Sequence, residues 1–302
     1  MSGFIAGSGI CNIDLIFSGL EKLPDEGTEI YSKNFEMRLG GGAVGSIITL
    51  SKLGIPTKLL TYQASDIFSN FAINEIKKSG LIPIDLRGSS AFNTNISISL
   101  VTSNDRTFIS YGQKIRKGSD SEEILYENCK GAFAVIMEIG LYHDVYSKLK
   151  SEGTKLLLDI GYDSNASITK YIRELELADV FLPNRSEAIK MTRENDFIKA
   201  GYVLNKIVPL VIITADKDGA YIFQNARVKH IPPSTDYQYV DATGAGDAFL
   251  SGFAYGLYNN FDINTSVFIA NMLGAKCVSM YGCLSTNVDE NDLKLEINRA
   301  KR

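Results

Sequence analysis

Short apolar runs alternate with helical stretches through the second half of this sequence, and this alternation constrains the fold more than any other feature. Each run and its following helix are, in order, 133–137 and 142–151, 155–159 and 168–177, and 180–182 and 185–192. Repeated strand and helix units of this kind build a mostly parallel sheet with helices on both faces. A further buried strand is predicted at 210–214, followed by a hairpin of 220–223 and 228–231. We therefore predict an α/β fold in which functional groups gather at the carboxyl ends of strands.

The N-terminal part follows a different pattern, in which apolar and polar residues alternate. Alternation occurs at 35–39 and 96–100, and a turn at 103–105 leads into another strand. Such strands are half exposed, so we predict a small β-sheet that covers the site as a lid, formed by approximately 12–40 and 90–112. The whole chain, 1–302, is then a single domain. The alternative is an antiparallel extension at the edge of the main sheet.

Composition excludes several classes of protein. Of the 302 residues, 45% are hydrophobic, which suffices for a large core, and the formal net charge of −4 comes without a basic tract. We therefore expect no binding to nucleic acid and none to a membrane. The four cysteines are scattered and only two histidines exist, so neither a zinc site nor a Ser-His-Asp triad is indicated. The N-terminus has neither a basic start nor a long apolar run, which favours a cytoplasmic protein.

The segment D-A-T-G-A-G-D-A-F-L-S-G-F, at 241–253, leads small residues into a helix. An α-helix leaves its first amides unpaired and carries partial positive charge there, so Gly244, Ala245 and Gly246 can hold a transferring phosphoryl group. Asp247 then lies within reach as a base. In the alternative interpretation, Thr243 only caps the helix and Asp247 only complements its dipole.

A glycine-rich segment, G-G-G-A-V-G at 40–45, precedes a second predicted helix. It satisfies the G-x-G-x-x-G pattern of dinucleotide sites and has Asp66 about 20 residues on, which makes a nicotinamide-dependent oxidoreductase a rival hypothesis. However, the strand before the glycines alternates as an exposed strand does, whereas a dinucleotide fold begins with a buried one. The other interpretation is that Gly41 and Gly42 let a polyhydroxylated ligand approach backbone amides. A third interpretation is that these glycines form a plain tight turn.

Two further pairs of polar residues follow predicted strands. Asn12 and Asp14 can grip adjacent sugar hydroxyls, although an Asn-x-Asp loop is also a common turn. Asn184 and Glu187 lie one helical turn apart, where a metal-bound phosphate could lie, and a capping pair is the equal alternative.

Taken in order, these residues resemble the ribokinase family of carbohydrate and nucleoside kinases, also called the PfkB family. The resemblance covers nearly the whole chain and is carried by 12–14, the glycines leading to 50–54, 65–66, 184–187, 214–219 and 241–247. It implies a three-layer α/β/α fold with a mostly parallel central sheet and a small β-sheet lid. Neither a Gly-x-x-x-x-Gly-Lys-Ser/Thr loop nor a protein-kinase motif set occurs in the sequence.

The resemblance also assigns roles to residues. Asp247 is the expected catalytic base, and the amides of Gly244, Ala245 and Gly246 are the expected anion site. The other implied contacts are Asn12, Asp14, Gly41, Gly42 and Glu138 with the sugar; Asn184, Thr214, Gly219 and Asn271 with ATP; Glu187 with Mg²⁺ through phosphate or water; and Asp241 and Thr243, with the backbone near Gly282, with a monovalent cation such as K⁺.

Some positions depart from the family pattern. Gly45 stands where many members have a sugar-binding Asn, and Asp216 replaces the usual Gly of the nucleotide loop. The segment D-I-G-Y at 159–162 lacks the D-P-N-x-R motif of many hexose and ketodeoxysugar kinases. Asp216 also places a carboxylate near the expected triphosphate, which would either weaken ATP binding or redirect the loop by like-charge repulsion. Arg106, on the predicted lid, either reaches a substrate carboxylate or phosphate or is a solubilising strand residue.

The predicted function is ATP-dependent phosphorylation of a hydroxymethyl group of a furanose-like sugar such as ribose or fructose, with Mg²⁺. A nucleoside kinase is the nearest alternative, because Phe92, Tyr31 or Tyr111 could stack on a base. An oxidoreductase and a sugar-binding protein without turnover are the alternatives from other classes. Lid strands often expose edges that pair between subunits, which predicts a homodimer through the lid.

Overall fold

The computed structural model describes residues 3–86, 93–103, 106–113, 115–161, 163–234, 243–279, 291, 293 and 294. Within these residues the main sheet has nine strands in the order β13-β12-β11-β10-β9-β8-β1-β4-β5. Its strands are β1 (Ile5–Gly9), β4 (Thr57–Thr61), β5 (Ile84–Asp85), β8 (Ala134–Ile136), β9 (Lys155–Leu158), β10 (Val180–Phe181), β11 (Leu210–Thr214), β12 (Ala220–Gln224) and β13 (Arg227–Ile231).

The main sheet is parallel from β5 to β11 and ends in the antiparallel hairpin of β12 and β13. Its order changes direction at β1, which lies between β4 and β8. In open parallel sheets a crevice forms beyond the carboxyl ends of strands at such a point. The predicted alternation of strands and helices and the predicted hairpin are both present.

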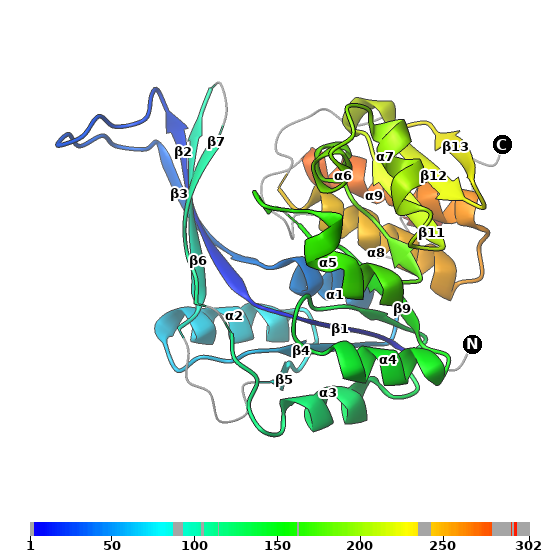
Figure 1. The fold of residues 1–302 in the computed structure, drawn as a ribbon. Coiled ribbons are helices and arrows are strands. Elements are labelled where there is room, and N and C mark those ends of the chain that lie inside the picture. Colours follow the sequence, from blue (N-terminus) through cyan, green and yellow to red (C-terminus); the bar gives the residue numbers. More distant parts are fainter. Residues whose placement is uncertain are drawn as a thin grey trace.

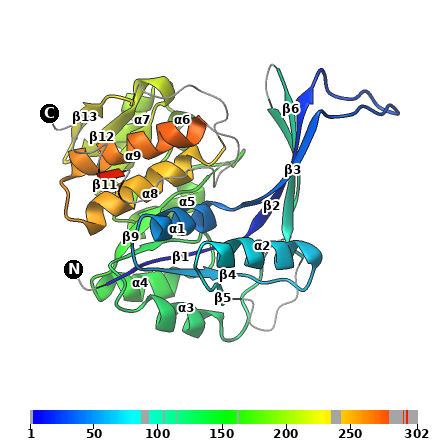
Figure 2. The same cartoon turned by 180° about the vertical axis from the view of Figure 1, so that it is seen from behind.

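Helices cover both faces of this sheet and make three layers. One face carries α1 (Gly42–Lys52), α2 (Ile67–Lys78), α8 (Ala245–Tyr258) and α9 (Ile263–Val278), which Figure 2 shows in front of the sheet. The other face carries α3 (Ser121–Cys129), α4 (His143–Ser151), α5 (Ile168–Leu177), α6 (Arg185–Thr192) and α7 (Phe197–Leu204), seen in Figure 1. Neighbouring strand residues enter opposite layers, as Leu59 and Leu60 do, because side chains alternate along a strand.

The lid is a separate four-stranded sheet in the order β3-β2-β6-β7, and it stands beside the body in Figures 1 and 2. Its strands are β2 (Asn12–Leu20), β3 (Asn34–Gly40), β6 (Asn95–Thr102) and β7 (Arg106–Tyr111). The lid prediction is therefore confirmed, and the alternative of an edge extension of the main sheet is wrong. Asn12 and Asp14 begin a long strand of this lid, and not the turn that was the alternative interpretation.

The two faces of the lid differ in chemistry, because residues that pair across strands share a face. Pairing places Met37, Leu15, Ile98 and Ile109 in one row of the outer face. The next rows add Phe35, Phe17, Leu100 and Thr107, and Leu39, Ile13, Ile96 and Tyr111. The inner face carries the row of Arg38, Asp14, Ser97 and Ser110 and also Asn12. The next inner row is Glu36, Ile16, Ser99 and Phe108. The inner face of the lid is thus mostly polar, with Ile16 and Phe108 as its apolar side chains in these rows, and the outer face carries no charged side chain in its rows.

Among the residues that the structure describes, no helix combines the length and the apolar character that crossing a membrane requires. The predicted closing helix at 291–302 lies almost entirely outside the described residues.

Candidate active site

Two helices begin at glycines whose positions leave the helix amides without a side-chain cap. Helix α1 follows Gly41, with a φ of 111°, and helix α8 follows Gly244, with a φ of 79°. Helices α3 and α4 also lack a side-chain cap, but neither begins at a glycine. The side chains of Asp66, Ser167, Asn184, Asp196 and Asp262 cap helices α2, α5, α6, α7 and α9. A side chain at Gly41 would collide with the carbonyl oxygen of Ile10. Uncapped amides at a positively polarised helix end suit an anion or a hydroxyl-rich ligand.

Asp247, in the first turn of α8, places its carboxyl against the first turn of α1. Its Oδ1 lies 3.1 Å from where a β-carbon on Gly42 would be, and its Oδ2 lies 3.6 Å from the same point on Gly45. The hydroxyls of Ser46 and Ser251 donate to its main-chain carbonyl, at 3.2 and 2.6 Å. The side chain is therefore held on the glycine surface of α1.

Burial raises the pKa of Asp247 well above its ordinary value, and the nearby charges of Asp159 and Asp14 raise it further. A carboxylate with a raised pKa is a stronger base than an exposed one, and it is better matched to removing a proton from an alcohol.

Asn12 and Asp14 lie on the inner face of the lid and contact each other. The Asn12 amide donates to Oδ1 of Asp14 at 2.6 Å and to the hydroxyl of Ser97 at 3.1 Å. A side chain on Gly40 would overlap the Asp14 carboxyl, since its β-carbon would lie 2.5 Å from Oδ2. The pair is thus positioned by the pleat of β2 and by a glycine on β3, and it presents an amide and a carboxylate to hydroxyl groups.

Asp159 is a carboxylate that the sequence did not assign to the site. It comes directly after β9, and its Oδ1 accepts a hydrogen bond from the Gly161 amide at 3.0 Å. Its Oδ2 lies 4.0 Å from where a β-carbon on Gly246 would be. Burial raises the pKa of this group. The signal in the sequence was its position at a strand end, and no motif accompanied it.

Glu187 and Asn184 form the capping box that was one of the two interpretations of this motif. The Asn184 side chain accepts from the Glu187 amide and the Glu187 side chain accepts from the Asn184 amide, both at 2.9 Å. Burial, followed by the charge of Asp159, raises the pKa of Glu187 to about 7. A carboxylate whose pKa is raised by burial and by the charge of a second acid is a place where a cation would be stabilised.

Three of the residues expected at ATP shape the loops around them. Thr214 ends β11 and bridges in parallel to Asn184. Gly219 packs against the main chain of Ile231 to Pro233, where any side chain would collide. Asn271, buried in α9, donates to the carbonyls of Ile231 and Pro232 at 3.3 and 2.8 Å. Gly219 and Asn271 therefore fix one segment from two sides.

Asp216 adopts a left-handed backbone conformation, with a φ of 49°. This explains why glycine is usual here, and Asp is among the few other residues that tolerate such a φ.

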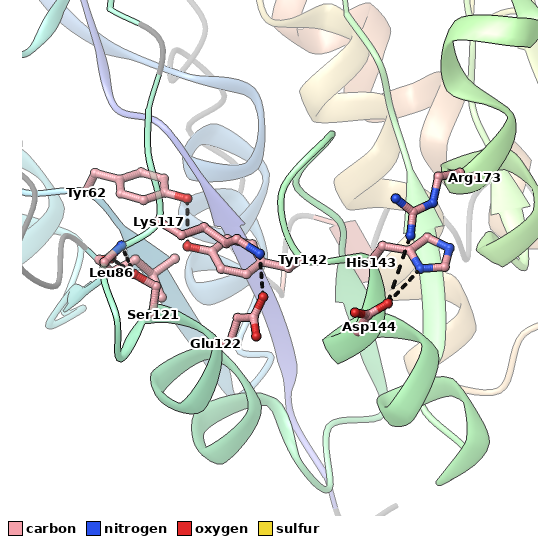
Figure 3. A network of polar contacts seen from close by, with 10 residues as sticks. Tyr62, Leu86, Lys117, Ser121, Glu122, Tyr142, His143, Asp144 and Arg173 are labelled. Carbon is pink, nitrogen blue, oxygen red and sulfur yellow. Dashed lines mark hydrogen bonds and ion pairs between the residues drawn. The ribbon is translucent and has the colours of Figure 1, made fainter.

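Tyrosines surround Glu138, which follows β8. The hydroxyl of Tyr62 donates to Oε2 of Glu138 at 2.8 Å and lies 3.0 Å from the hydroxyl of Tyr142, a contact drawn in Figure 3. The Glu138 amide donates to the hydroxyl of Tyr146 at 2.8 Å, and that hydroxyl also contacts Ser8 at 2.6 Å. Burial raises the pKa of Glu138 to about 7, against the lowering effect of the Tyr62 hydrogen bond. Tyr62 and Tyr146 carry no motif, so the sequence alone did not indicate them.

The residues expected at a monovalent cation are only partly described. Asp241 and Gly282 lie outside the described residues. The hydroxyl of Thr243 accepts a hydrogen bond of 2.9 Å from Nη1 of Arg106, which comes from the lid. Across the part of the chain that the structure describes, no group of three or more His, Cys, Asp or Glu side chains is arranged to hold a metal ion.

The dinucleotide interpretation of residues 40–45 conflicts with the fold. The strand before these glycines is β3 of the lid, and not a strand of the main parallel sheet. Asp66, expected at a ribose, caps α2 by accepting from the Ser69 amide at 2.8 Å and also contacts Thr94. Residues 40–45 therefore do not form the strand, turn and helix unit that positions a dinucleotide.

Comparison with known proteins agrees with this geometry. A family model described as pfkB family carbohydrate kinase matches residues 4–290. The chain belongs to this family. As a PfkB carbohydrate kinase it is a phosphotransferase, and its fold is the ribokinase-like α/β fold with a mostly parallel sheet and a four-stranded lid.

Individual relatives differ in what they are named for. A ribokinase of Lactococcus lactis is 21% identical over 277 residues, which are 91% of this chain and 90% of the relative. A protein named as an uncharacterized sugar kinase, from Archaeoglobus fulgidus, is 32% identical over 108 residues, covering 36% of this chain and 43% of that protein. The structure of a Burkholderia thailandensis nucleoside kinase in complex with inosine has a TM-score of 0.78 at 17% identity, covering 98% of this chain and 96% of that one. The fold is thus shared by sugar and nucleoside kinases.

Proposed function

We propose that this chain transfers the γ-phosphoryl group of ATP to a hydroxymethyl group of a furanose-like sugar. The observation that carries the proposal is the position of the Asp247 carboxyl between two uncapped helix N-termini and within electrostatic range of Asp14. A base, an anion site and a hydroxyl-binding pair then meet in one place.

In the proposed step Asp247 takes the proton of the sugar hydroxyl as its oxygen forms a bond to the γ-phosphorus. The bond from that phosphorus to the β,γ-bridging oxygen breaks, and the electron pair leaves with ADP. Amides of Gly244, Ala245 and Gly246 would stabilise the charge on the phosphoryl oxygens, which is worth most in a site that excludes water. Asn12 and Asp14 would orient the sugar so that this hydroxyl faces Asp247.

The sugar would also contact Gly41 and Gly42 and the carboxyl of Glu138. ATP would lie along Asn184 and Thr214, on the loop that Gly219 and Asn271 hold in place. Mg²⁺, bound with the triphosphate, would neutralise phosphate charge and be oriented by Glu187, whose pKa is raised by burial and further by the charge of Asp159. Asp241 and Thr243 would hold a monovalent cation such as K⁺.

The lid favours a sugar over a nucleoside. Tyr111, one of three residues considered for stacking on a base, lies on the outer face of the lid, since it pairs in the row of Ile96. Tyr31 is 83% exposed, and Phe92 lies outside the described residues. Ser97 and Ser110 line the inner face beside Asp14 and offer hydroxyls. Phe108, the aromatic residue of the next inner row, lies beside the Arg106 guanidinium, which is 5.6 Å from its ring centre.

The decisive experiment measures ADP formation with Mg²⁺ and K⁺ across pentoses, hexoses, acid sugars and nucleosides. We expect turnover with a furanose-forming sugar and a loss of about 10²–10⁴-fold in kcat for Asp247→Asn, because that is the usual contribution of a positioned base. Retained sugar and ATP binding in this variant shows that the loss is chemical. Nucleoside turnover without sugar turnover would replace the substrate, and unchanged kcat in Asp247→Asn would refute the base assignment.

We also propose a homodimer through the outer face of the lid. Phe35, Met37, Ile109 and Tyr111 are 57%, 38%, 60% and 50% exposed on this uncharged face. A second copy presents the same apolar sheet face, so the two can cover each other around a twofold axis. Ile109→Lys should shift the protein to monomer in sedimentation velocity, whereas Lys22→Glu at an exposed position should not. A wild-type monomer at high concentration would refute the proposal.

A further inference from the structure

A closed ring of five residues lies on the face of the main sheet that α6 and α7 cover (Figure 1). Its members, each in contact with the next, are Arg185, Phe197, Tyr221, His230 and Asp218, and Asp218 contacts Arg185 again. Tyr221 and His230 pair across β12 and β13, so their side chains share a face, and Tyr221 and Phe197 both pack on the core layer of α6 and α7. The ring is therefore on the opposite side of the sheet from α8 and α9.

Arg185, the first residue of α6, links this helix to the loop of residues 214–219. Its Nη2 donates to Oδ2 of Asp218 at 2.6 Å and to the carbonyl of Ala215 at 3.4 Å. Its Cζ lies 4.6 Å from the ring centre of Phe197, and this cation–π contact limits the orientations of the guanidinium. The hydrogen bond from Arg185 lowers the pKa of Asp218, so both partners are charged near neutral pH.

The loop that Arg185 holds is one at which ATP is expected. It begins at Thr214, which bridges in parallel to Asn184, and it ends at Gly219. Between them lies a single 3-10 turn, Asp216–Asp218, and the Gly219 amide closes it with a hydrogen bond of 3.1 Å. Hydrogen bonds in a 3-10 turn have poorer geometry than those of an α-helix. Contacts from outside the turn therefore contribute to its position.

His230 holds the same turn from the other side. Its Nε2 donates to the carbonyl of Asp218 at 2.6 Å, and this nitrogen carries the hydrogen because a carbonyl only accepts. His230 directly precedes residues 231–233, the segment that Gly219 and Asn271 contact. The ring thus joins three segments at which ATP is expected, namely the start of α6, the 214–219 loop and the segment at the end of β13.

The stability of the fold does not account for Arg185. Its Nε is buried and has no hydrogen-bond partner among the atoms that the structure describes, and a buried unpaired donor lowers stability. The side chains of Arg185 and Asp218 are 34% and 45% exposed, and ion pairs with this much contact with solvent contribute little to stability. The arginine is therefore better explained by where it places the loop.

We propose that Arg185 is a positioning residue for ATP, which acts through Asp218 to hold the 214–219 loop against the start of α6. This inference rests on the proposed phosphoryl transfer. The groups expected to bind the sugar and to remove its proton lie on the lid and on α8. Losing Arg185 should therefore weaken nucleotide binding and spare both sugar binding and the chemical step.

The first test compares steady-state constants. We expect Arg185→Gln to raise the KM for ATP about three- to tenfold, as for loss of one partly exposed ion pair and one cation–π contact, with kcat and the sugar KM within about twofold of the wild type. Asp218→Asn should give a similar rise, and the double variant should exceed neither single variant by much, because both changes remove the same bond. Arg185→Lys keeps the charge without the planar fork and should recover part of the affinity. Single-variant effects that multiply in the double variant would overturn the proposal.

A second test measures ADP binding and does not depend on knowing the acceptor. In isothermal titration calorimetry with Mg²⁺, the dissociation constant of ADP should rise in Arg185→Gln by the same factor as the KM for ATP. Urea unfolding of the same variant identifies a purely structural role, which would lower stability and leave ADP affinity unchanged. That result would overturn the inference. Should Arg185→Gln fail to fold, Asp218→Asn carries the same test.

The matched control is Arg173→Gln, which removes an exposed arginine of α5 that pairs with Asp144 at 4.0 Å (Figure 3). It should leave the KM for ATP and the ADP affinity unchanged. A loss in Arg185→Gln that is confined to kcat or to the sugar KM would also overturn the inference. If the wild type binds ADP but phosphorylates neither a sugar nor a nucleoside, the proposed function fails, and the ADP titration still decides the role of Arg185. A wild type that binds no ADP removes both.

Discussion

Removing the hydroxyl of Tyr62 should change the pH at which the enzyme takes up its sugar. This hydroxyl donates to the Glu138 carboxylate at 2.8 Å, and burial raises the pKa of that carboxyl to about 7. Near neutral pH, Glu138 is therefore about half ionised. If the ionised form accepts the hydrogen bond of a sugar hydroxyl, kcat/KM for the sugar rises with pH through this range.

The size of the change follows from the hydrogen bond that is lost. A bond to a charged group contributes about 1.5–3 kcal/mol, and one pKa unit corresponds to about 1.36 kcal/mol. Because Glu138 is only half-buried, the lower end applies, and Tyr62→Phe should raise the pKa of Glu138 by about one unit. The ionised fraction at pH 7 then falls from about one half to about one tenth, which predicts about a fivefold drop in kcat/KM.

The assay is the pH profile of kcat/KM for the sugar between pH 5.5 and pH 9.5, with ATP saturating. We expect the ascending limb of Tyr62→Phe to move to higher pH and to converge with the wild type above about pH 9. Tyr126→Phe is a suitable control, because that hydroxyl donates to Glu152 at an exposed site. A profile that keeps its position, or one that moves to lower pH, would refute the assigned role of the Tyr62 bond.

Three further predictions concern the site and its supports. Asp247→Asn should raise the melting temperature at pH 7, and this advantage should disappear near pH 4. The reason is that the pKa of Asp247 is raised in the folded protein, so the wild type loses stability as the pH rises toward that pKa. Differential scanning calorimetry at both pH values measures the difference. Asn271→Leu should lower stability by about 1–3 kcal/mol in urea unfolding and raise the KM for ATP, since the carbonyls of Ile231 and Pro232 lose their buried donor. Asp216→Gly should lower the KM for ATP by removing a carboxylate, with stability changed by less than about 1 kcal/mol, because relief of the left-handed conformation offsets the extra freedom of the unfolded chain. A higher KM for ATP in Asp216→Gly, or unchanged unfolding in Asn271→Leu, would contradict these assignments.

Elements with a continuous apolar run or a strict period were predictable from the sequence. The strand at 210–214 is β11, Leu210–Thr214, because a run of four consecutive apolar residues suits a strand that is covered on both faces by helices. The strand β2 was harder to recognise, because its sequence N-I-D-L-I-F-S-G-L interrupts the alternation with adjacent apolar residues. Its nine residues are nevertheless what carries Asn12 and Asp14 into the lid.

The site was predictable where a helix start defines it and unpredictable where contacts are made at long range. Glycines before α8 and the carboxylate after them follow from the chemistry of helix ends, and the structure brings Asp247 against Gly42. No local pattern announces that Asp159 approaches Gly246, that Tyr62 reaches Glu138 or that Arg106 reaches Thr243. The two hydrogen bonds join residues that are 76 positions apart (Tyr62 and Glu138) and 137 positions apart (Arg106 and Thr243), so only the tertiary fold creates these contacts.

The two-sided chemistry of the lid constrains how its strands can change in length. Deleting one residue at the start of β6 would turn every following side chain to the opposite face. Ile96, Ile98 and Leu100, which lie on the outer face, would then point into the site, and Ser97 would point away from it. Deleting two adjacent residues shortens the strand but leaves hydroxyls inside and hydrocarbons outside. Length variation in this sheet should therefore be tolerated in steps of two.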